Sequence, residues 1–273
     1  DGTVAIGGCT FCSADGSSAF EEAKHRSLAA QFENAVSIMR KKWPNGKYLV
    51  YFQANTNTHA PVVHLQELFE EALKLDANII GIAIATRPDC LPEDVLDYLE
   101  NLSKRTYLSV ELGLQTIHEL TAKKLNRGHD TLSFTRAVQA LRNRNIEVVA
   151  HIINGLPGET KEMMLETTQY LNRLDIQGIK IHMLYLASDT PLGRLYLKQP
   201  WDVLTLPEYV DIVCDQIESL RPDIIIHRVT GDGKKAELIA PLWTQKKFVI
   251  QNEIDKELRR RQSFQGAKYD SHF

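Results

Sequence analysis

The sequence has few cysteines, no long apolar run and no strong excess of either charge. Four cysteines in 273 residues are too few for a disulfide scaffold, and a chain of this length can bury a large core without one. No apolar run reaches the roughly 20 residues that a membrane-spanning helix needs, and no signal peptide is visible. The net charge of −3 excludes the overall cationic field typical of general nucleic-acid binding. These absences predict a globular cytoplasmic protein without membrane contact.

Apolar segments alternate with amphipathic ones through most of the chain. Six segments are largely apolar and rich in β-branched residues, which is typical of parallel strands covered on both faces. They span residues 47–53, 79–85, 106–112, 147–153, 179–186 and 223–229. Apolar residues at helical spacing predict helices between them and again at Ile250, Ile254 and Leu258. Repeated βαβ units predict an α/β fold, either an open doubly wound sheet or a full or partial barrel.

A Cys-x-x-Cys pair, Cys9 and Cys12, lies in a glycine-bearing loop ahead of the first predicted strand. Two thiolates at this spacing can converge on one metal ion or iron–sulfur cluster. The pair alone also fits two free or disulfide-bonded thiols. A thioredoxin-type site and a structural zinc site fit poorly, because the strand-to-helix context and a second ligand pair are missing. Cys90 and Cys214 lie in helical contexts, and we expect them to fill the core.

Four predicted strands end in polar or glycine-rich segments, at residues 53–58, 85–89, 111–115 and 151–159. Each segment alone could be a cap or a turn. Because parallel strands end at the same edge of a sheet, their recurrence predicts a polar cleft at the C-terminal mouth. There Glu111 can accept from an ammonium group, Gln115 can donate and accept, and Arg127 can bind a carboxylate. This inventory suits an amino-acid-bearing nucleoside, and many other small polar ligands as well.

These segments together resemble the radical S-adenosylmethionine (SAM) superfamily. The resemblance rests on VELGLQTIHELTAKKLNRGHD, VVAHIINGLPGET and IATRPD, and it covers nearly the whole chain. It is closest to the bacterial YhcC/YtqA-type group of predicted Fe–S oxidoreductases, with the catalytic subunit of Elongator more distant. The resemblance implies a partial (β/α)6 TIM-like barrel over residues 1–245, with a short C-terminal helical extension over residues 246–273.

The resemblance also implies a [4Fe–4S] cluster held by three cysteines, with one iron open to the amino and carboxylate groups of SAM. In this group the first cysteine lies ahead of the Cys-x-x-Cys pair, in a segment like CPNRDGT. Asp1-Gly2-Thr3 matches the end of that segment, but the cysteine itself is absent from the sequence. The sequence therefore supplies Cys9 and Cys12, and we expect the third ligand upstream of Asp1.

Further roles follow from the resemblance, position by position. Phe11 is expected beside the adenine of SAM, and residues 53–56 replace the glycine-rich motif that contacts its amino group. Leu184 or Tyr185 is expected to complete the adenine wall. The other residues that match SAM contacts are Gln53, Asn55, Thr86, Glu111, Gln115, Arg127, His151, Asn154, Gly155 and Leu156.

The implied reaction is reductive cleavage of SAM to a 5′-deoxyadenosyl radical, with a flavodoxin or ferredoxin as electron donor. The Elongator relationship favours tRNA wobble-uridine modification, and KKLNRGH, KKWPNGK and ELRRRQ would supply local basic patches or solvated faces. Radical modification of a small metabolite is an alternative, and a barrel that binds SAM or a partner without catalysis is another. Polar residues that could reach the mouth are Asn57, His59, Lys123, Lys124, His129, His182 and Arg228.

Overall fold

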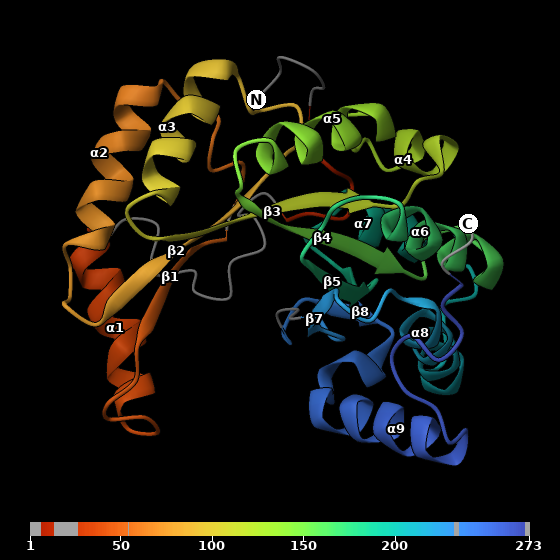
Figure 1. Ribbon diagram of the computed structural model, residues 1–273. Coiled ribbons are helices and arrows are strands. Elements are labelled where there is room, and N and C mark those ends of the chain that lie inside the picture. The colour runs from red at the N-terminus through yellow and green to blue at the C-terminus, as the bar shows by residue number, and fades with distance from the viewer. Residues whose placement is uncertain (1–6, 14–26, 54, 232–234, 271–273) are drawn as a thin grey trace.

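The computed structural model describes residues 7–13, 27–53, 55–231 and 235–270. Its main sheet has six parallel strands that follow one another in the order β1-β2-β3-β4-β5-β7. They are β1 (Tyr48–Phe52), β2 (Ile79–Thr86), β3 (Tyr107–Gln115), β4 (Glu147–Asn154), β5 (Gly178–Met183) and β7 (Ile225–Arg228). The order never reverses, as it would in a doubly wound sheet, and the sheet curls into an arch (Figure 1). The predicted partial barrel is therefore confirmed.

Helices cover the convex face of the arch (Figure 1). The helices of the described residues are α1 (Leu28–Arg40), α2 (Val62–Leu73), α3 (Glu93–Ser103), α4 (Glu119–Lys124), α5 (Thr131–Arg142), α6 (Lys161–Asn172), α7 (Pro191–Lys198), α8 (Leu206–Ser219) and α9 (Lys247–Arg260). Of these, α2, α3, α5 and α6 contact strands of the main sheet, and α9 packs on α8. Capping side chains fix where several helices begin. Asp130 before α5 and Thr160 before α6 each accept a hydrogen bond from a backbone N–H in the first turn. Thr205 before α8 forms a capping box with Glu208. In the part of the chain that the structure describes, no helix combines the length and the apolar character needed to cross a bilayer.

Side chains of each strand alternate between the helical layer and the concave face. On β3, Leu108, Val110, Leu112 and Leu114 are buried in the main hydrophobic core. The residues between them, Ser109, Glu111, Gly113 and Gln115, therefore face the inside of the arch. The same alternation on the neighbouring strands makes the concave face polar, which is where a site can form.

The predicted strand at residues 179–186 is wrong in its extent. β5 ends at Met183, and Leu186–Ala187 forms a separate strand, β6, that pairs antiparallel with β8 (Leu238–Ala240). This small second sheet was not predicted, because three residues give too short a pattern to recognise. Gly193 in α7 packs directly against β6, since a Cβ there would lie 1.9 Å from the carbonyl oxygen of Ala187.

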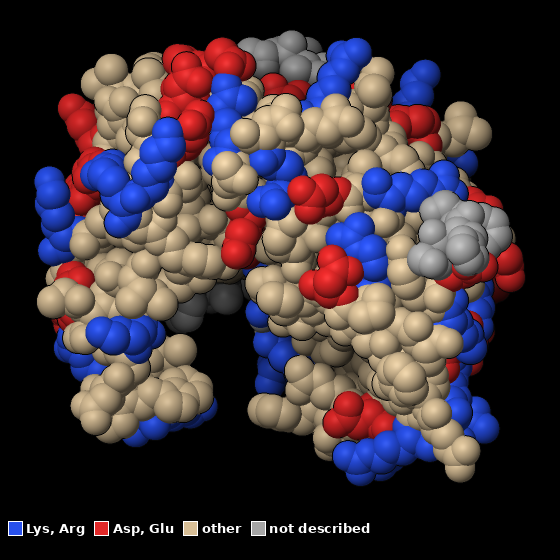
Figure 2. All heavy atoms as spheres, in the orientation of Figure 1, with Lys and Arg blue, Asp and Glu red and all other residues tan. Residues whose placement is uncertain are grey.

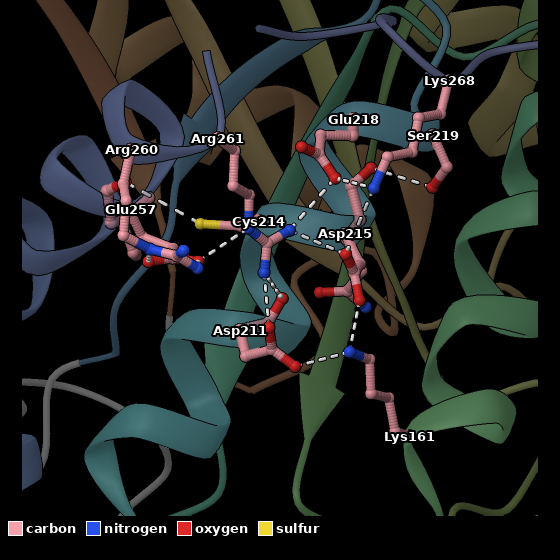
Figure 3. A network of polar contacts seen from close by, with 12 residues as sticks. Lys161, Asp211, Cys214, Asp215, Glu218, Ser219, Glu257, Arg260, Arg261 and Lys268 are labelled. Carbon is pink, nitrogen blue, oxygen red and sulfur yellow. Dashed lines mark hydrogen bonds and ion pairs between the residues drawn. The ribbon is translucent and has the colours of Figure 1, made fainter. Parts of the chain in front are cut away.

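The C-terminal helix α9 is packed on the barrel. Ile250 and Ile254 are buried in the main core, and the short 3-10 helix η2 (Leu242–Gln245) precedes them. Figure 3 shows Arg261, just past α9, surrounded by carboxylates of α8. Its guanidinium lies 2.7 Å from Asp215 and 3.0 Å from Glu218. At Arg261 the basic end of the chain is thus part of an internal ion-pair network.

Candidate active site

The loop that carries the Cys-x-x-Cys pair is held between two distant helices. The backbone N–H of Thr10 donates to the carbonyl oxygen of Leu125 at 2.9 Å, and the N–H of Leu192 donates to the carbonyl oxygen of Thr10 at 2.8 Å. Asn126 donates from its side chain to the carbonyl oxygen of Gly8 at 2.7 Å. Gly8 has a φ of +67°, a left-handed conformation that glycine adopts without strain. The end of α4 and the start of α7 therefore fix the position of both cysteines.

The two thiols interact with each other. Cys9 and Cys12 are half-buried and are not joined by a disulfide. Their mutual hydrogen bond lowers the pKa of Cys9, with help from the positive charges of Arg87 and Arg127, and it raises the pKa of Cys12, as burial also does. Thiolates are the form that ligates iron, and the lowered pKa favours the thiolate form of Cys9. Within the described residues, no group of three His, Cys, Asp or Glu side chains is arranged to hold a metal ion, and the pair fits two of the three ligands of a family-type cluster.

A cavity of about 210 Å³ lies next to Cys12, on the concave face of the sheet. Seven of the residues expected to contact the cluster or SAM line it: Phe11, Cys12, Gln53, Gln115, His151, Leu184 and Tyr185. Of the other polar candidates, His182 and Arg228 also line it. The cavity therefore runs along the polar face of the sheet to the cysteine loop.

The concave face of the sheet holds a cluster of charged groups around Glu111. Lys180 lies 2.5 and 2.7 Å from its two carboxylate oxygens. His151 Nε2 and the hydroxyl of Tyr51 lie 2.7 and 2.6 Å from Oε2. Burial alone would raise the pKa of Glu111, but the hydrogen bond and charge of His151 and the ion pair with Lys180 outweigh it and lower the pKa to about 2. Glu111 is therefore ionised, and its oxygens are engaged by groups of the chain itself.

Burial favours the neutral form of both histidines of this region. Burial lowers the pKa of His151, against the opposing effect of Glu111. Burial, then the neighbouring His151, lowers the pKa of His182 well below its ordinary value. The two rings lie with their centroids 5.2 Å apart.

Gln115 adopts an unusual backbone conformation where β3 ends. Its φ is +67°, in the left-handed region that residues other than glycine rarely adopt. Its side chain folds back over Gly113, where a Cβ would lie 2.6 Å from the amide nitrogen of Gln115. Strain of this kind is concentrated at functional sites, and here it directs an amide toward the cavity.

Arg127 lies outside the cavity lining and makes its hydrogen bonds within the chain. The side chain is buried, and it donates to the carbonyl oxygens of Leu114, Thr116 and His129 at 2.5 to 2.8 Å. Its other terminal nitrogen lies 3.3 Å from a carboxylate oxygen of Glu119. In this structure the guanidinium supports the segment that holds the cysteine loop.

The other residues named from the sequence lie outside the cavity lining. Thr86 shares a 2.6 Å hydrogen bond with Thr58, and the amide of Asn154 donates to Gln216 at 2.7 Å. Leu156 is buried in a small apolar cluster with Leu184, against which Phe11 packs. Asn55 has a φ of +64° and Gly155 one of +85°. These residues shape the surroundings of the cavity.

Among the cavity residues that were not singled out in the sequence are Tyr51, Lys180 and Asp189. Lys180 did carry a signal, because it is a lysine within an otherwise apolar strand, two positions before His182. Tyr51 is likewise two positions before Gln53 and so shares its face. Asp189 had no such signal, since it follows the unpredicted strand β6.

Known proteins match this chain along most of its length. The model of the radical SAM superfamily matches residues 6–171, and that of the radical SAM C-terminal domain matches residues 176–260. The uncharacterised protein YtqA of Bacillus subtilis is 52% identical, over 97% of this chain and 82% of its own length. Protein YhcC of Escherichia coli is 35% identical, over 94% and 82%.

More distant matches lead to Elongator. Elongator complex protein 3 of Saccharomyces cerevisiae is 27% identical, over 56% of this chain and 28% of its own length. The solved structure of Elp3 from Methanocaldococcus infernus has a TM-score of 0.71 at 17% identity, covering 87% of this chain and 59% of that one. This likeness supports the fold, independently of the sequence matches.

Proposed function

The chain belongs to the radical SAM superfamily and is a radical SAM enzyme, and we propose that it cleaves SAM reductively at a [4Fe–4S] cluster to start hydrogen abstraction from a substrate. When bound, the cluster would supply one electron to the sulfonium of SAM, whose carbon–sulfur bond breaks to give methionine and a 5′-deoxyadenosyl radical. A flavodoxin or ferredoxin is the proposed donor of that electron.

The observation that carries this proposal is that residues of the cysteine loop line the cavity. Cys12 and Phe11 line the cavity, and Cys9 has a lowered pKa one turn away. In the proposal Cys9 and Cys12 ligate two irons of the cluster, as thiolates do in such sites. Arg127 acts as a positioning residue, because its carbonyl oxygen lies 3.8 Å from Cys9 Sγ.

Of the other cavity residues, some are proposed to make polar contacts with SAM and others apolar contacts. Gln53 and Gln115 offer amides to the methionine part, since an amide both donates and accepts. Phe11 and Leu184, from the apolar cluster, flank the adenine. Within the described chain, these side chains also limit the access of water to a reactive radical.

A small molecule is the proposed substrate class. The cavity is a hollow of about 210 Å³ within the barrel. Figure 2 shows Lys and Arg interspersed with Asp and Glu over the face in view, so no broad patch of positive charge appears there. Arg261, in the basic C-terminal segment, is engaged by carboxylates. These observations favour a ligand that enters the cavity over a polynucleotide bound across that face.

Modification of a wobble uridine in tRNA is the second candidate, favoured by the similarity to Elongator complex protein 3. A gel-shift assay with unmodified tRNA over a salt series separates the two. A tRNA-modifying enzyme would bind with an affinity that falls steeply as salt rises, because phosphate contacts release counterions. We expect this protein to bind tRNA only weakly. We also expect Lys→Gln substitutions in the KKWPNGK segment to leave that affinity unchanged.

The central experiment measures 5′-deoxyadenosine release from SAM. The protein, expressed from its native start codon, is reconstituted with iron and sulfide without oxygen and assayed with a strong reductant. We expect release that Cys9→Ala and Cys12→Ala abolish and that Cys90→Ala, at a buried cysteine outside the site, leaves nearly unchanged. A protein that binds neither iron nor SAM under these conditions would contradict the proposal and favour a barrel without catalysis.

A further inference from the structure

Two buried polar atoms of the cavity have no hydrogen-bond partner within the described chain. Among the described residues, six buried side-chain nitrogen and oxygen atoms lack a partner, and two of the six belong to residues that line the cavity. They are Nε2 of His182, on β5, and Oδ1 of Asp189, which follows β6. Buried polar groups in proteins are almost always hydrogen-bonded, because leaving one without a partner costs free energy. Two such atoms in one cavity therefore indicate a ligand that supplies the partners from outside the chain.

These two atoms lie along a wall of the cavity that also contains Tyr185. A Cβ on Gly231 would lie 3.5 Å from Nδ1 of His182 and 3.7 Å from the ring of Tyr185, so Gly231 connects the two rings. Burial raises the pKa of Tyr185, and the neighbouring Cys12 and Asp189 add to this effect. The wall therefore runs from His182 past Tyr185 to Asp189, at the end of the cavity that Cys12 also lines.

Carboxylates make this end of the cavity negative. Asp189 and Glu237 both line it, and Glu237 accepts a hydrogen bond from the hydroxyl of Ser188, a neutral group that does not compensate its charge. A carboxylate can only accept hydrogen bonds, and a buried one costs free energy without a positive partner. Oδ1 of Asp189 therefore favours a ligand group that is both a hydrogen-bond donor and a cation.

His182 offers a neutral contact to the same ligand. Burial lowers its pKa well below the ordinary value, and the neighbouring His151 adds to this effect. A neutral imidazole can donate or accept at Nε2, depending on its tautomer. His182 therefore suits an uncharged polar atom of the ligand, such as a hydroxyl group.

We propose that Asp189 and His182 form a subsite for a substrate that carries an amine. The ammonium group lies against Oδ1 of Asp189, and a second polar atom of the same molecule bonds to Nε2 of His182. Glu237 adds to the negative potential that selects the amine. Because Cys12 lines the same end of the cavity, an amine held at Asp189 brings its neighbouring carbon atoms toward the cysteine loop. The inference names the substrate class of the proposed function, and it rests on that function.

Calorimetry of the reconstituted protein, saturated with SAM and without reductant, tests the subsite without turnover. Ethanolamine is titrated as the amine, and ethylene glycol, which has a neutral hydroxyl in place of the ammonium, as its matched probe. Both titrations are made at constant ionic strength. We expect saturable binding of ethanolamine and roughly tenfold weaker binding of ethylene glycol, because the hydrogen bond to Asp189 loses its charge.

Three variants assign the preference to its residues. Asp189→Asn should remove the preference for ethanolamine over ethylene glycol. His182→Phe keeps a ring but loses both nitrogens, and it should weaken both probes alike, since both carry a hydroxyl. Asp202→Asn is the matched control, because Asp202 is exposed and outside the cavity lining, and it should leave both affinities unchanged.

The melting temperature separates a ligand site from a structural role for Asp189. A buried carboxylate without a partner destabilises the fold in the absence of ligand. We therefore expect Asp189→Asn to keep or raise the melting temperature of the protein without SAM or amine. A clear decrease would show that Asp189 stabilises its loop, and it would overturn the subsite.

Three further results would overturn it. They are the absence of saturable ethanolamine binding, equal affinity for the two probes, and an equal loss of preference in the Asp189→Asn and Asp202→Asn variants. Ethanolamine binding that appears only without SAM would assign Asp189 to the ammonium group of SAM instead. Amine binding needs no SAM cleavage, so its failure leaves the proposed function standing. Loss of 5′-deoxyadenosine release would conversely leave amine binding measurable.

Discussion

Single residues on the concave face are held in place by one buried carboxylate. Glu111 binds Lys180, His151 and Tyr51 together, and the ring of Tyr51 lies 4.4 Å from the ammonium of Lys180. Removing a buried charge from such a group leaves its partner unpaired, which costs more than an exposed ion pair contributes. Glu111 therefore organises the site without lining the cavity.

This carboxylate predicts a specific acid dependence of stability. The pKa of Glu111 is lowered from 4.5 to about 2, so its contribution is fully present above about pH 5 and is lost as pH falls toward 2. The size is about 3 kcal/mol in the free energy of unfolding. Urea denaturation between pH 7 and pH 3 should show this loss in the wild type. Glu111→Gln should be less stable at pH 7 and flatter with pH, whereas equal pH slopes in both proteins would contradict the assignment.

A substitution at Gly113 is expected to weaken the binding of SAM with little effect on the stability of the fold. Gly113→Ala would place a Cβ 2.6 Å from the amide nitrogen of Gln115, and this flexible amide can move aside. We expect a small change in melting temperature but a roughly tenfold weaker affinity for SAM, about 1.4 kcal/mol. Calorimetry on Gly113→Ala, Gln115→Ala and the double variant checks this. Additive losses would show that Gly113 acts independently of Gln115.

Whether a site residue could be predicted from the sequence depended on the residues next to it in the chain. Gln53, Gln115 and His151 could be predicted because they lie at or near the ends of apolar strands, where polar side chains stand out. Arg127 follows the end of α4 rather than a strand, and it is buried and bonded to backbone oxygens. Only the tertiary structure shows whether a guanidinium has its donors engaged.

At the scale of elements, α9 is attached to α8 by both core contacts and charges. Ile250 and Ile254 are buried, and Arg261 binds Asp211, Asp215, Glu218 and Glu257 at once. The ion pairs are partly buried and share one guanidinium, so they form a network rather than isolated surface pairs (Figure 3).

Two adjacent arginines test this network. Arg261→Met would leave the carboxylates on α8 without their shared cation, and we expect a loss of about 2–4 kcal/mol in the free energy of unfolding. Arg260 is exposed and, among the described residues, forms an ion pair with Glu257 alone, so Arg260→Met should change stability by less than about 0.5 kcal/mol. Urea denaturation measures the free energy of unfolding of both variants. Equal losses would show that the network around Arg261 stabilises the fold no more than a single exposed ion pair does.

The elements themselves were largely predictable, because strand and helix periods differ. All six main strands were located within a few residues, since each combines β-branched residues with flanking helices. The break at Leu184 and the pairing of β6 with β8 were not predicted, because they depend on contacts between residues about 50 positions apart. The polar mouth followed from the rule that parallel strands end together.

As a whole molecule, the half-barrel does not depend on the cysteine loop for its core. The main hydrophobic cluster draws on strands β2 to β5 and the helices over them, while the loop is tied to the barrel by a few hydrogen bonds. This differs from small metal-dependent domains, which unfold without their metal.

Removal of iron should therefore leave the barrel folded. After chelation we expect an unchanged far-ultraviolet circular dichroism spectrum and a melting temperature within about 5 °C of the reconstituted protein, because a shift of that size reflects only about 1–2 kcal/mol in a chain this long. Limited proteolysis should cleave near the cysteine loop faster in the iron-free form. Global unfolding on chelation would show that the barrel needs the cluster.

The hydrogen bonds of Thr10 also set an order of events during synthesis. The cysteines leave the ribosome early, but Leu192, which helps to hold their loop, is made about 180 residues later. At roughly 5–20 residues per second, the pair waits on the order of ten seconds or more before its binding geometry exists. Delivery of iron and sulfide is thus a step that follows translation of most of the barrel, and during that interval the nascent thiols are exposed to oxidants.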